Sequence, residues 1–400
     1  MPFRTRPQPA PILFLALFAA QAGFLVLTPI LPEVARDLGV STATAGGLRI
    51  ASGLAGGVVA LTVSSVGRRL GLRDLLAGGL LLVGVSSAIG VAAPSFTVLA
   101  LSQLALGAGH AIVLSAALAA AARWSQPTER PRVLGWVLLG QPAAWVASMP
   151  VIGVLASSSW RLTMCVPFAA SALALGVLAS RPPDAPEAAR GRLRALLGRD
   201  CTVAGWAVGE LLAYAAWGGT LTFAAALMIE SYGSSPALVG LLLAVAATAY
   251  FPGNRLARRR AGESPRQLLT LLGGGLAVVL AIFGAVRPGL WFSAAMFGLI
   301  VLLTGGRTLA GSAAGLQAAP GDEVTVMSLR AAAMQLGIVI GAALGGVALA
   351  AGGYALLGPV LSILFAAGAA PHLATLRTPA IQPSSGRFRE GLKESLPACR

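Results

Sequence analysis

The chain has 400 residues, of which 56% are hydrophobic and only 11% are charged, and its formal net charge is +15. Such an apolar composition excludes an ordinary soluble domain and predicts a protein whose core is shared with lipid. The positive charge does not indicate nucleic-acid binding, because the basic residues gather on one side of the predicted membrane segments.

Twelve apolar stretches of roughly 20 residues follow one another along the chain, each long enough to cross a bilayer as a helix. Their continuous hydrophobicity excludes the alternating pattern of a membrane β-barrel. We therefore predict an all-α integral membrane protein with twelve transmembrane helices. The predicted spans are 11–32, 43–66, 73–92, 96–120, 133–156, 162–180, 203–229, 236–254, 267–286, 289–314, 326–351 and 355–375.

Basic residues distinguish the two sides of these spans. With a cytoplasmic N-terminus, most of the 29 Lys and Arg residues fall in inside loops and tails, and Arg330 is counted among them. The outside loops carry only Arg36, Arg161 and Arg287. This positive-inside pattern predicts that both termini are cytoplasmic. The strong preference for Arg over Lys, with abundant Ala and Gly, is typical of a GC-rich bacterial genome and favours a bacterial plasma (inner) membrane.

Catalytic and metal-binding motifs are absent from the sequence. There is no P-loop for an ATP-driven pump and no H-E-x-x-H or paired Cys-x-x-Cys motif for zinc. The three cysteines lie far apart, which predicts neither a disulfide framework nor a metal cluster. We expect a protein that is not an enzyme and needs no cofactor, with the lipid bilayer and a small molecule as its partners, no nucleic acid, and a monomeric state.

A single offset relates the two halves of the chain. A shift of 194 positions aligns Gly39 with Gly233 and Gln141 with Gln335, and the same register holds across six spans. This indicates two copies of a six-helix unit, 1–180 and 203–376, related by an axis along the membrane normal. A polar linker at 181–202 and a disordered cytoplasmic tail at 377–400 complete the predicted organisation. Such pseudo-symmetry favours alternating access, in which two bundles rock about a central site.

Two segments carry a resemblance to a known family. The exit from the first span, Leu27 to Gly39, and the loop Ser64 to Arg73 are similar to signatures of the major facilitator superfamily, the latter to G-x-x-x-D-R-x-G-R-R. A second copy of that loop is expected at Gly253 to Arg260. More narrowly, the chain resembles the drug and metabolite proton antiporters. The resemblance implies the family's twelve-helix fold, efflux as an antiporter, and a conformational gate at Arg68, Arg69, Gly71, Arg73 and Asp74.

The chain departs from the family pattern at several positions. Arg68 replaces the loop aspartate, with Asp74 as a candidate substitute, and Gln103 replaces an arginine that is tied to proton transfer in many exporters. The fifth-span antiporter pattern survives only as Met149 to Gly153. Proton coupling and export therefore rest on weaker matches than the fold does.

Charged residues within membrane spans are costly and need an explanation. Glu210 and Arg307 lie at similar depths in the seventh and tenth spans and could pair. The resemblance places the first, fourth, seventh and tenth spans around the cavity, so both residues are expected near the transport path. Burial favours a neutral carboxyl and Arg307 favours an ionised one, a balance that a proton-coupled carrier can use. We predict Glu210, His110 and Arg307 as proton-coupling candidates.

Helical spacing groups further polar and aromatic residues on the cavity faces. On the seventh span the spacing places four residues on one face, and the first, fourth and fifth spans each contribute a glutamine. The predicted substrate-cavity residues are Gln21, Gln103, Gln141, Trp145, Trp206, Tyr214, Trp217 and Gln335.

Simpler readings of the same residues stay open. A Glu–Arg pair can merely hold two helices together, aromatic stripes often only pack, and His110 can be a satisfied polar residue between helices. Arg49, inside the second span, is expected either to snorkel to the interface or to close the outer gate against the second half.

Together these features predict a proton-driven secondary transporter that exports a small amphiphilic or lipophilic compound. One alternative is an uptake symporter or exchanger for a nutrient or organic anion, with Arg307 or Arg49 binding a carboxylate. A second alternative is a membrane sensor or scaffold that does not transport.

Overall fold

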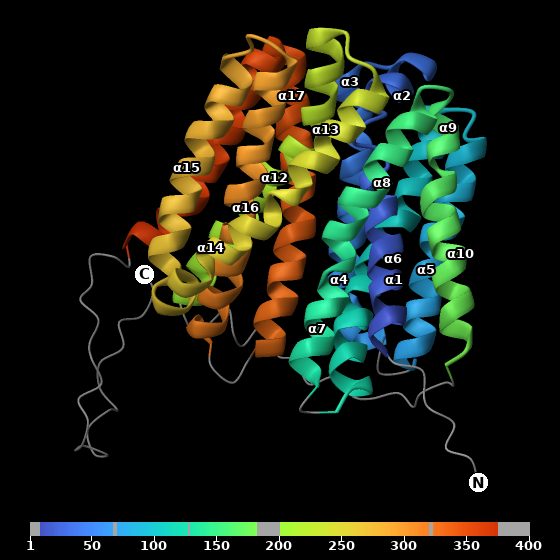
Figure 1. Ribbon diagram of the computed structural model, residues 1–400, viewed down its shortest axis with the longest axis vertical. Coiled ribbons are helices and arrows are strands. Elements are labelled where there is room, and N and C mark those ends of the chain that lie inside the picture. The colour runs from blue at the N-terminus through green and yellow to red at the C-terminus, as the bar shows by residue number, and fades with distance from the viewer. Residues whose placement is uncertain (1–8, 67–69, 127–128, 182–200, 320–322, 375–400) are drawn as a thin grey trace.

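The computed structural model describes residues 9–66, 70–126, 129–181, 201–319 and 323–374. Within these ranges the chain folds into long helices joined by short turns (Figure 1). The helices of the first half are α1 (Pro9–Leu25), α2 (Leu31–Asp37), α3 (Thr42–Ala45), α4 (Gly47–Val66), α5 (Leu72–Ala92), α6 (Phe96–Trp124), α7 (Arg130–Leu138), α8 (Gly140–Ala156), α9 (Trp160–Thr163) and α10 (Cys165–Ala179). Those of the second half are α12 (Cys201–Tyr232), α13 (Pro236–Thr248), α14 (Tyr250–Glu263), α15 (Pro265–Ala285), α16 (Leu290–Ala318) and α17 (Glu323–Ala374).

The all-α membrane architecture is confirmed. Nine helical stretches in the described ranges are long and apolar enough to cross a membrane, and one of them, Leu329–Leu373, covers two predicted spans. That stretch turns at Gly352 and Gly353, whose backbone is not helical. Gly353 has a φ of +63°, a left-handed conformation that glycine adopts without steric cost. The predicted boundary between the last two spans is therefore correct.

Two predicted boundaries differ from the structure. The first span was expected to reach residue 32, but α1 ends at Leu25 and a turn leads to the short helix α2. Pro29 and Pro32 explain this early end, because proline cannot continue a helix without losing a hydrogen bond. The segment Gly253 to Arg260 was expected to be a loop, yet it is helical within α14. Gly253 packs there against the backbone of Leu302 in α16.

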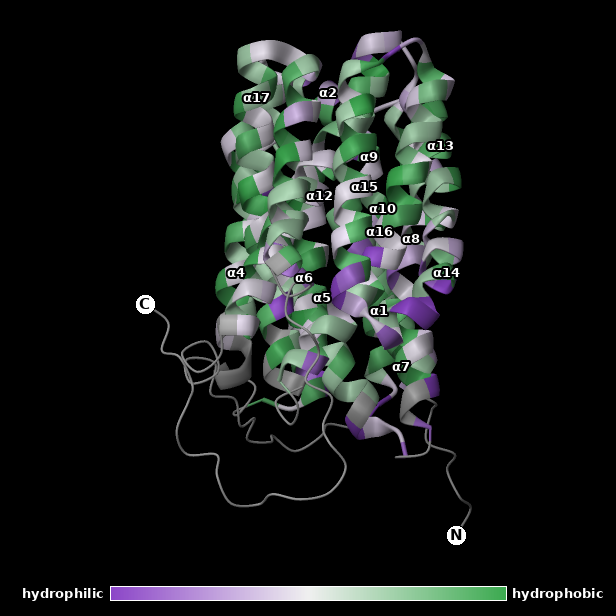
Figure 2. Ribbon diagram, turned by 90° about the vertical axis from the view of Figure 1, so that its left-hand side faces the viewer, coloured by the Kyte–Doolittle hydropathy of each residue, from purple (hydrophilic) through white to green (hydrophobic). Residues whose placement is uncertain are grey.

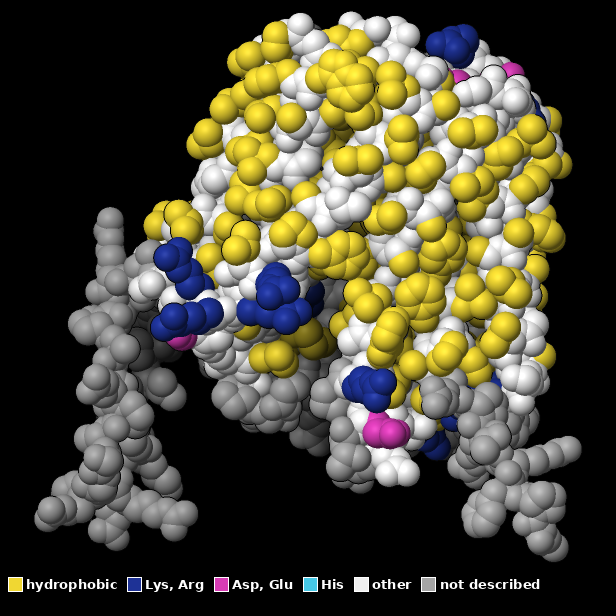
Figure 3. Space-filling view, viewed as in Figure 1, with side chains coloured by type: hydrophobic (Ala, Val, Ile, Leu, Met, Phe, Trp, Pro, Cys, Tyr) yellow, Lys and Arg dark blue, Asp and Glu magenta, His cyan; other side chains and the backbone are white. Residues whose placement is uncertain are grey.

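The surface of the helices is that of a protein in lipid. Large apolar side chains such as Leu101, Val245 and Trp291 are 60% to 70% exposed. Figure 2 shows hydrophobic residues along the length of the helices, and Figure 3 shows a broad hydrophobic face with most Lys and Arg side chains nearer one end. Exposed apolar side chains of this number are expected only where lipid surrounds the protein.

We call the end that carries α2 and α3 the upper end, and the end where α1 and α7 begin the lower end (Figure 1). The first and second halves contact each other through α8 with α13 and through α4 with α17. A Cβ added to Gly153 would lie 2.6 Å from the carbonyl oxygen of Pro236, and one added to Gly53 would lie 2.6 Å from the Val339 side chain. Such close approach requires small residues at the crossing.

Gly153 and Pro236 lie near the end of α8 and the start of α13, so this crossing joins the two halves toward the upper end. In the space-filling view the face is hollowed between the two halves toward the lower end (Figure 3). Of the predicted linker, only Arg181 and the helical Cys201 and Thr202 are described, and the predicted tail 377–400 lies outside the described residues.

Candidate functional site

A buried carboxylate with two arginine partners forms the charged centre of the second half. Glu210 on α12 is fully buried and accepts a 2.8 Å hydrogen bond from Nη2 of Arg307 on α16. Its other oxygen accepts a 2.8 Å hydrogen bond from Nε of Arg330 on α17. The predicted pair of Glu210 and Arg307 is therefore present in the structure, and a third charge joins it.

Arg330 was counted with the basic residues of the inside loops, and the structure shows a different position. It lies within α17, its side chain is only 14% exposed, and it also donates a hydrogen bond of 3.1 Å to the carbonyl oxygen of Thr308. The sequence held a signal for this placement, because residue 330 falls inside the predicted span 326–351. A charge at this position within a span is as costly as that of Arg307 and indicates a buried partner.

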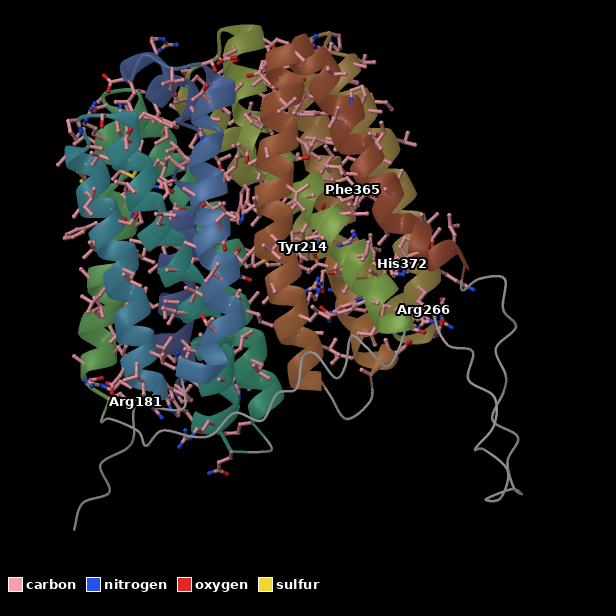
Figure 4. All side chains as sticks on the ribbon, turned by 180° about the vertical axis from the view of Figure 1, so that it is seen from behind. Arg181, Tyr214, Arg266, Phe365 and His372 are labelled. Carbon is pink, nitrogen blue, oxygen red and sulfur yellow. The ribbon has the colours of Figure 1, made fainter. Side chains whose placement is uncertain are left out.

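Aromatic residues on α12 flank this charged cluster, as their helical spacing predicted. The ring of Tyr214 lies 5.9 Å from the Arg307 guanidinium and 5.4 Å from that of Arg330. One turn below Glu210, Trp206 donates a 2.9 Å hydrogen bond to the carbonyl oxygen of Gly311 in α16. Trp206 thus packs between α12 and α16. Figure 4 shows Tyr214 in the second half on the side nearer the first half, and His372 farther away.

A row of aromatic rings connects the two halves of the protein. The rings of Trp145 on α8 and Trp217 on α12 lie 6.3 Å apart, and Trp217 stacks on Phe297 of α16 at 6.5 Å. Trp145 and Trp217 were predicted to line a cavity, and the structure brings them together. Phe297 was missed, since a phenylalanine within an apolar span gives no sequence signal.

The first half holds a neutral polar cluster around Gln21 on α1. The Oε1 atom of Gln21 lies 3.4 Å from the amide nitrogen of Gln141 and 3.5 Å from Nε2 of His110. The imidazole of His110 stacks on Phe24, with ring centres 5.2 Å apart. The predicted residues Gln21, His110 and Gln141 therefore share one site, remote in sequence from the charged cluster.

Gln103 and Gln335 are each 2% exposed. Among the described residues, the amide oxygens of both and Nδ1 of His110 have no hydrogen-bond partner. Gln335 lies where α17 crosses α4, because a Cβ on Gly56 would be 1.9 Å from its amide nitrogen. Buried polar atoms of this kind can accept hydrogen bonds from a bound molecule.

Arg49 does not snorkel, because its side chain is buried within its own half. It is 1% exposed, donates hydrogen bonds to the carbonyl oxygen of Phe24 and the hydroxyl of Thr28, and lies 4.3 Å from the Phe24 ring. The expected snorkelling is therefore wrong, and closure of the outer gate stays a prediction. The guanidinium instead ties α4 to α1.

The predicted conformational gate is described only in part. Arg68 and Arg69 lie outside the described residues. Gly71 caps α5, and Arg73 and Asp74 form an ion pair of 3.6 Å in its first turn. Asp74 also borders a groove with Leu70, Leu81 and Val85. The structure thus places Asp74 against its own helix neighbour.

Comparisons with known sequences identify relatives of this chain. Residues 13–207 match the Major Facilitator Superfamily. A "Chloramphenicol resistance protein" of Streptomyces lividans is 28% identical over 286 residues, which is 68% of this chain and 71% of that protein. An uncharacterized MFS-type transporter of Bacillus subtilis, YceJ, is 27% identical over 43% of this chain and 44% of its own length.

Solved structures share the fold over almost the whole chain. A bacterial homologue of the human lysosomal transporter Spinster, in an inward-facing and unoccupied conformation, matches with a TM-score of 0.70 and 16% identity, covering 94% of this chain and 95% of that one. A D-xylose-proton symporter matches with a TM-score of 0.73 at 13% identity, over 91% of this chain and 96% of that one. The nucleoside transporter NupG matches with a TM-score of 0.74 at 13% identity, over 92% and 98%. Residues 13–207 therefore match the Major Facilitator Superfamily, and the chain as a whole shares the fold of these multi-pass membrane transporters.

Proposed function

We propose that this transporter is a proton-driven exporter of a small amphiphilic or lipophilic compound, working by alternating access as an antiporter. The observation that carries the proposal is the charged cluster of Glu210, Arg307 and Arg330, which places one titratable acid between three helices of the second half. A relative whose name concerns chloramphenicol resistance supports efflux as the direction. We further propose a monomer in a bacterial inner membrane, with cytoplasmic termini and no cofactor besides the proton gradient.

The proposed cargo site lies between the aromatic row and the neutral polar cluster. Trp145 and Trp217 come from opposite halves and lie against each other, so a compound packed on this pair touches both rocking units. Gln21, Gln103 and Gln335 supply amide groups without charge. Aromatic faces with a few hydrogen-bonding groups suit an amphiphilic compound that carries a ring and a polar group.

Arg330 offers a physical link between protonation and rocking. It lies five residues before Gln335, or about 7.5 Å along α17 at 1.5 Å per residue. Gln335 packs against α4 of the other half, so movement of that crossing displaces Arg330 as well. If Arg330 withdraws from Glu210, the carboxylate loses one of its two charged partners inside the membrane, and uptake of a proton becomes favourable.

The test uses the purified full chain in liposomes with an imposed pH gradient and a pH-sensitive dye inside. Chloramphenicol, amphiphilic cations and organic acids are added one at a time. We expect an amphiphile to trigger proton movement in the direction opposite to its own. Silence with every compound, from protein shown to be folded, would contradict the proposal.

A specific observation favours a second candidate, transport of an organic anion. Two arginines face one glutamate, which leaves the cluster with one excess positive charge. A carboxylate could bind to Arg330, whose side chain is the most exposed of the three. In the same liposome assay, a response to organic acids alone, abolished by Arg330→Gln, would select this candidate.

A further inference from the structure

A contact at the upper end joins the two halves through a glutamate. Glu230, near the end of α12, accepts a hydrogen bond from the hydroxyl of Thr42 on α3, in the opposite half. Its other oxygen accepts a 2.7 Å hydrogen bond from Tyr354, which follows the turn in α17. Nearby, the ring of Phe223 on α12 fills the space beside Gly46. We call Thr42, Gly46, Phe223, Glu230 and Tyr354 the upper contact.

A second acid, Glu33 of the first half, lies beside the upper contact. Glu33 lies on α2, which packs against α12, and its Oε2 atom is buried without a hydrogen-bond partner among the described residues. Burial, and to a smaller extent the charge of Glu230, hold the pKa of Glu33 above its ordinary value, against the lowering effects of its own backbone and Arg36. An ionised carboxylate with one oxygen buried and unpaired is unfavourable, whereas a protonated one is much less so.

Among the described groups whose charge acts on Glu33, Arg36 is the cation and Glu230 is the acid from the other half. Arg36 lies on the same helix and is exposed, and α3 carries only hydroxyl groups toward the contact. From the second half come Glu230 and the hydroxyl of Tyr354, with Arg287 near Tyr354. Closing the upper contact therefore brings two acids from opposite halves together.

We propose that Glu33 is a proton-binding site of the upper contact, and that its proton stabilises the closed contact against repulsion from Glu230. When Glu33 is protonated, one negative charge remains and the contact closes. When both acids are ionised, they repel each other across the boundary between the halves, and the contact opens. The inference builds on alternating access but does not require Glu210, because these residues lie at the opposite end of α12.

The experiment measures opening of the upper end directly. Spin labels are placed at Thr97 and Ala285, exposed positions at the upper ends of α6 and α15, after the three native cysteines have been replaced by serine. In the full chain reconstituted in lipid nanodiscs, we expect the distance between the labels to lengthen as the pH rises from about 4 to about 8, a range that covers a raised glutamate pKa. Glu33→Gln is expected to keep the short distance throughout, and Glu230→Gln is expected to behave likewise.

Two control variants separate this site from other acids. Asp37→Asn removes an acid of the same helix whose partners Arg161 and Trp160 belong to its own half, so the pH response should persist. Glu210→Gln should also keep the response, even though it is expected to lose proton-driven transport. A wild-type distance that does not change with pH, or a full response in Glu33→Gln, would overturn the proposal while leaving the role of Glu210 to be tested separately.

Discussion

The two halves share a fold and a sequence register, yet among the described residues a buried cluster of ion pairs occurs only in the second half. At the offset of 194 positions, Glu210 and Arg307 correspond to Ala16 and Val113, which are 2% and 0% exposed in the apolar core of the first half. The polar cluster of the first half is neutral apart from Arg49. Because buried charges are expensive in a membrane, their presence in one copy indicates a specialised role there. We infer that the second half supplies the titratable charge used in transport, whereas the first half supplies mainly neutral hydrogen-bonding groups.

The largest effect on stability is expected when Glu210 is removed from the buried cluster of the second half. Glu210→Leu leaves Arg307 and Arg330 buried without their carboxylate, and we expect a loss of about 3 to 5 kcal/mol in the free energy of unfolding. The measurement is an unfolding titration in detergent. In a matched variant, Glu210→Leu is combined with Arg307→Met and Arg330→Met, which should recover most of the loss. A single variant as stable as the wild type would refute the buried-cluster description.

Arg49 provides the corresponding test in the first half. Arg49→Met loses hydrogen bonds to Phe24 and Thr28 but also removes a buried charge that forms no ion pair with an acid among the described residues. We expect a net loss of about 1 to 3 kcal/mol, smaller than that of Glu210→Leu in the same titration. A larger loss than that of Glu210→Leu would contradict the expectation that buried charge stabilises the second half more than the first.

The Trp145–Trp217 pair tests how strongly the two halves interact where they meet. Alanine at either position, and at both, gives a double-mutant cycle for the rings 6.3 Å apart. We expect a coupling energy of about 0.5 to 1.5 kcal/mol in unfolding. Trp206, which donates a hydrogen bond to Gly311 within the second half, serves as the control and should show no coupling to Trp145. Additive effects at Trp145 and Trp217 would show that the rings do not bridge the halves.

The smallest effect is expected at the exposed ion pair of the upper end. The Arg161 side chain, and then the Trp160 indole, hold the pKa of Asp37 below its ordinary range. A lowered folded-state pKa stabilises the protein above the unfolded pKa, and this stabilisation disappears as the pH falls through the folded value. Both side chains are a third or more exposed, so solvent screening limits the effect to about 0.5 kcal/mol. The stabilities of wild type and Asp37→Asn should differ slightly at neutral pH and converge in acid; a difference that grows in acid would contradict the assignment.

Periodicity and composition predicted much of this architecture. Uninterrupted apolar runs located the spans, and the 3.6-residue period placed Trp206, Glu210, Tyr214 and Trp217 on the face of α12 that meets its neighbours. The pairing of Glu210 with Arg307 followed from equal depth alone. These features depend on one helix at a time, or on the shared geometry of a bilayer.

Features that depend on how helices cross were not predictable from one sequence. Arg49 turned toward α1 because Phe24 and Thr28 offer it an oxygen and a ring, which no spacing along α4 reveals. The upper contact between Thr42 and Glu230 joins positions 188 residues apart. Arg330 is different, since its place within the predicted span 326–351 is itself a sequence signal for a buried charge.

The central claim, that Glu210 couples proton movement to transport, is tested most directly by comparing two modes of transport in liposomes. Once a cargo is known, the Glu210→Gln protein is assayed for exchange of labelled against unlabelled compound, and for accumulation driven by a pH gradient. We expect that exchange continues while gradient-driven accumulation is lost, with Asp37→Asn retaining both. Undiminished accumulation in Glu210→Gln would contradict the claim and remove this residue from the coupling mechanism.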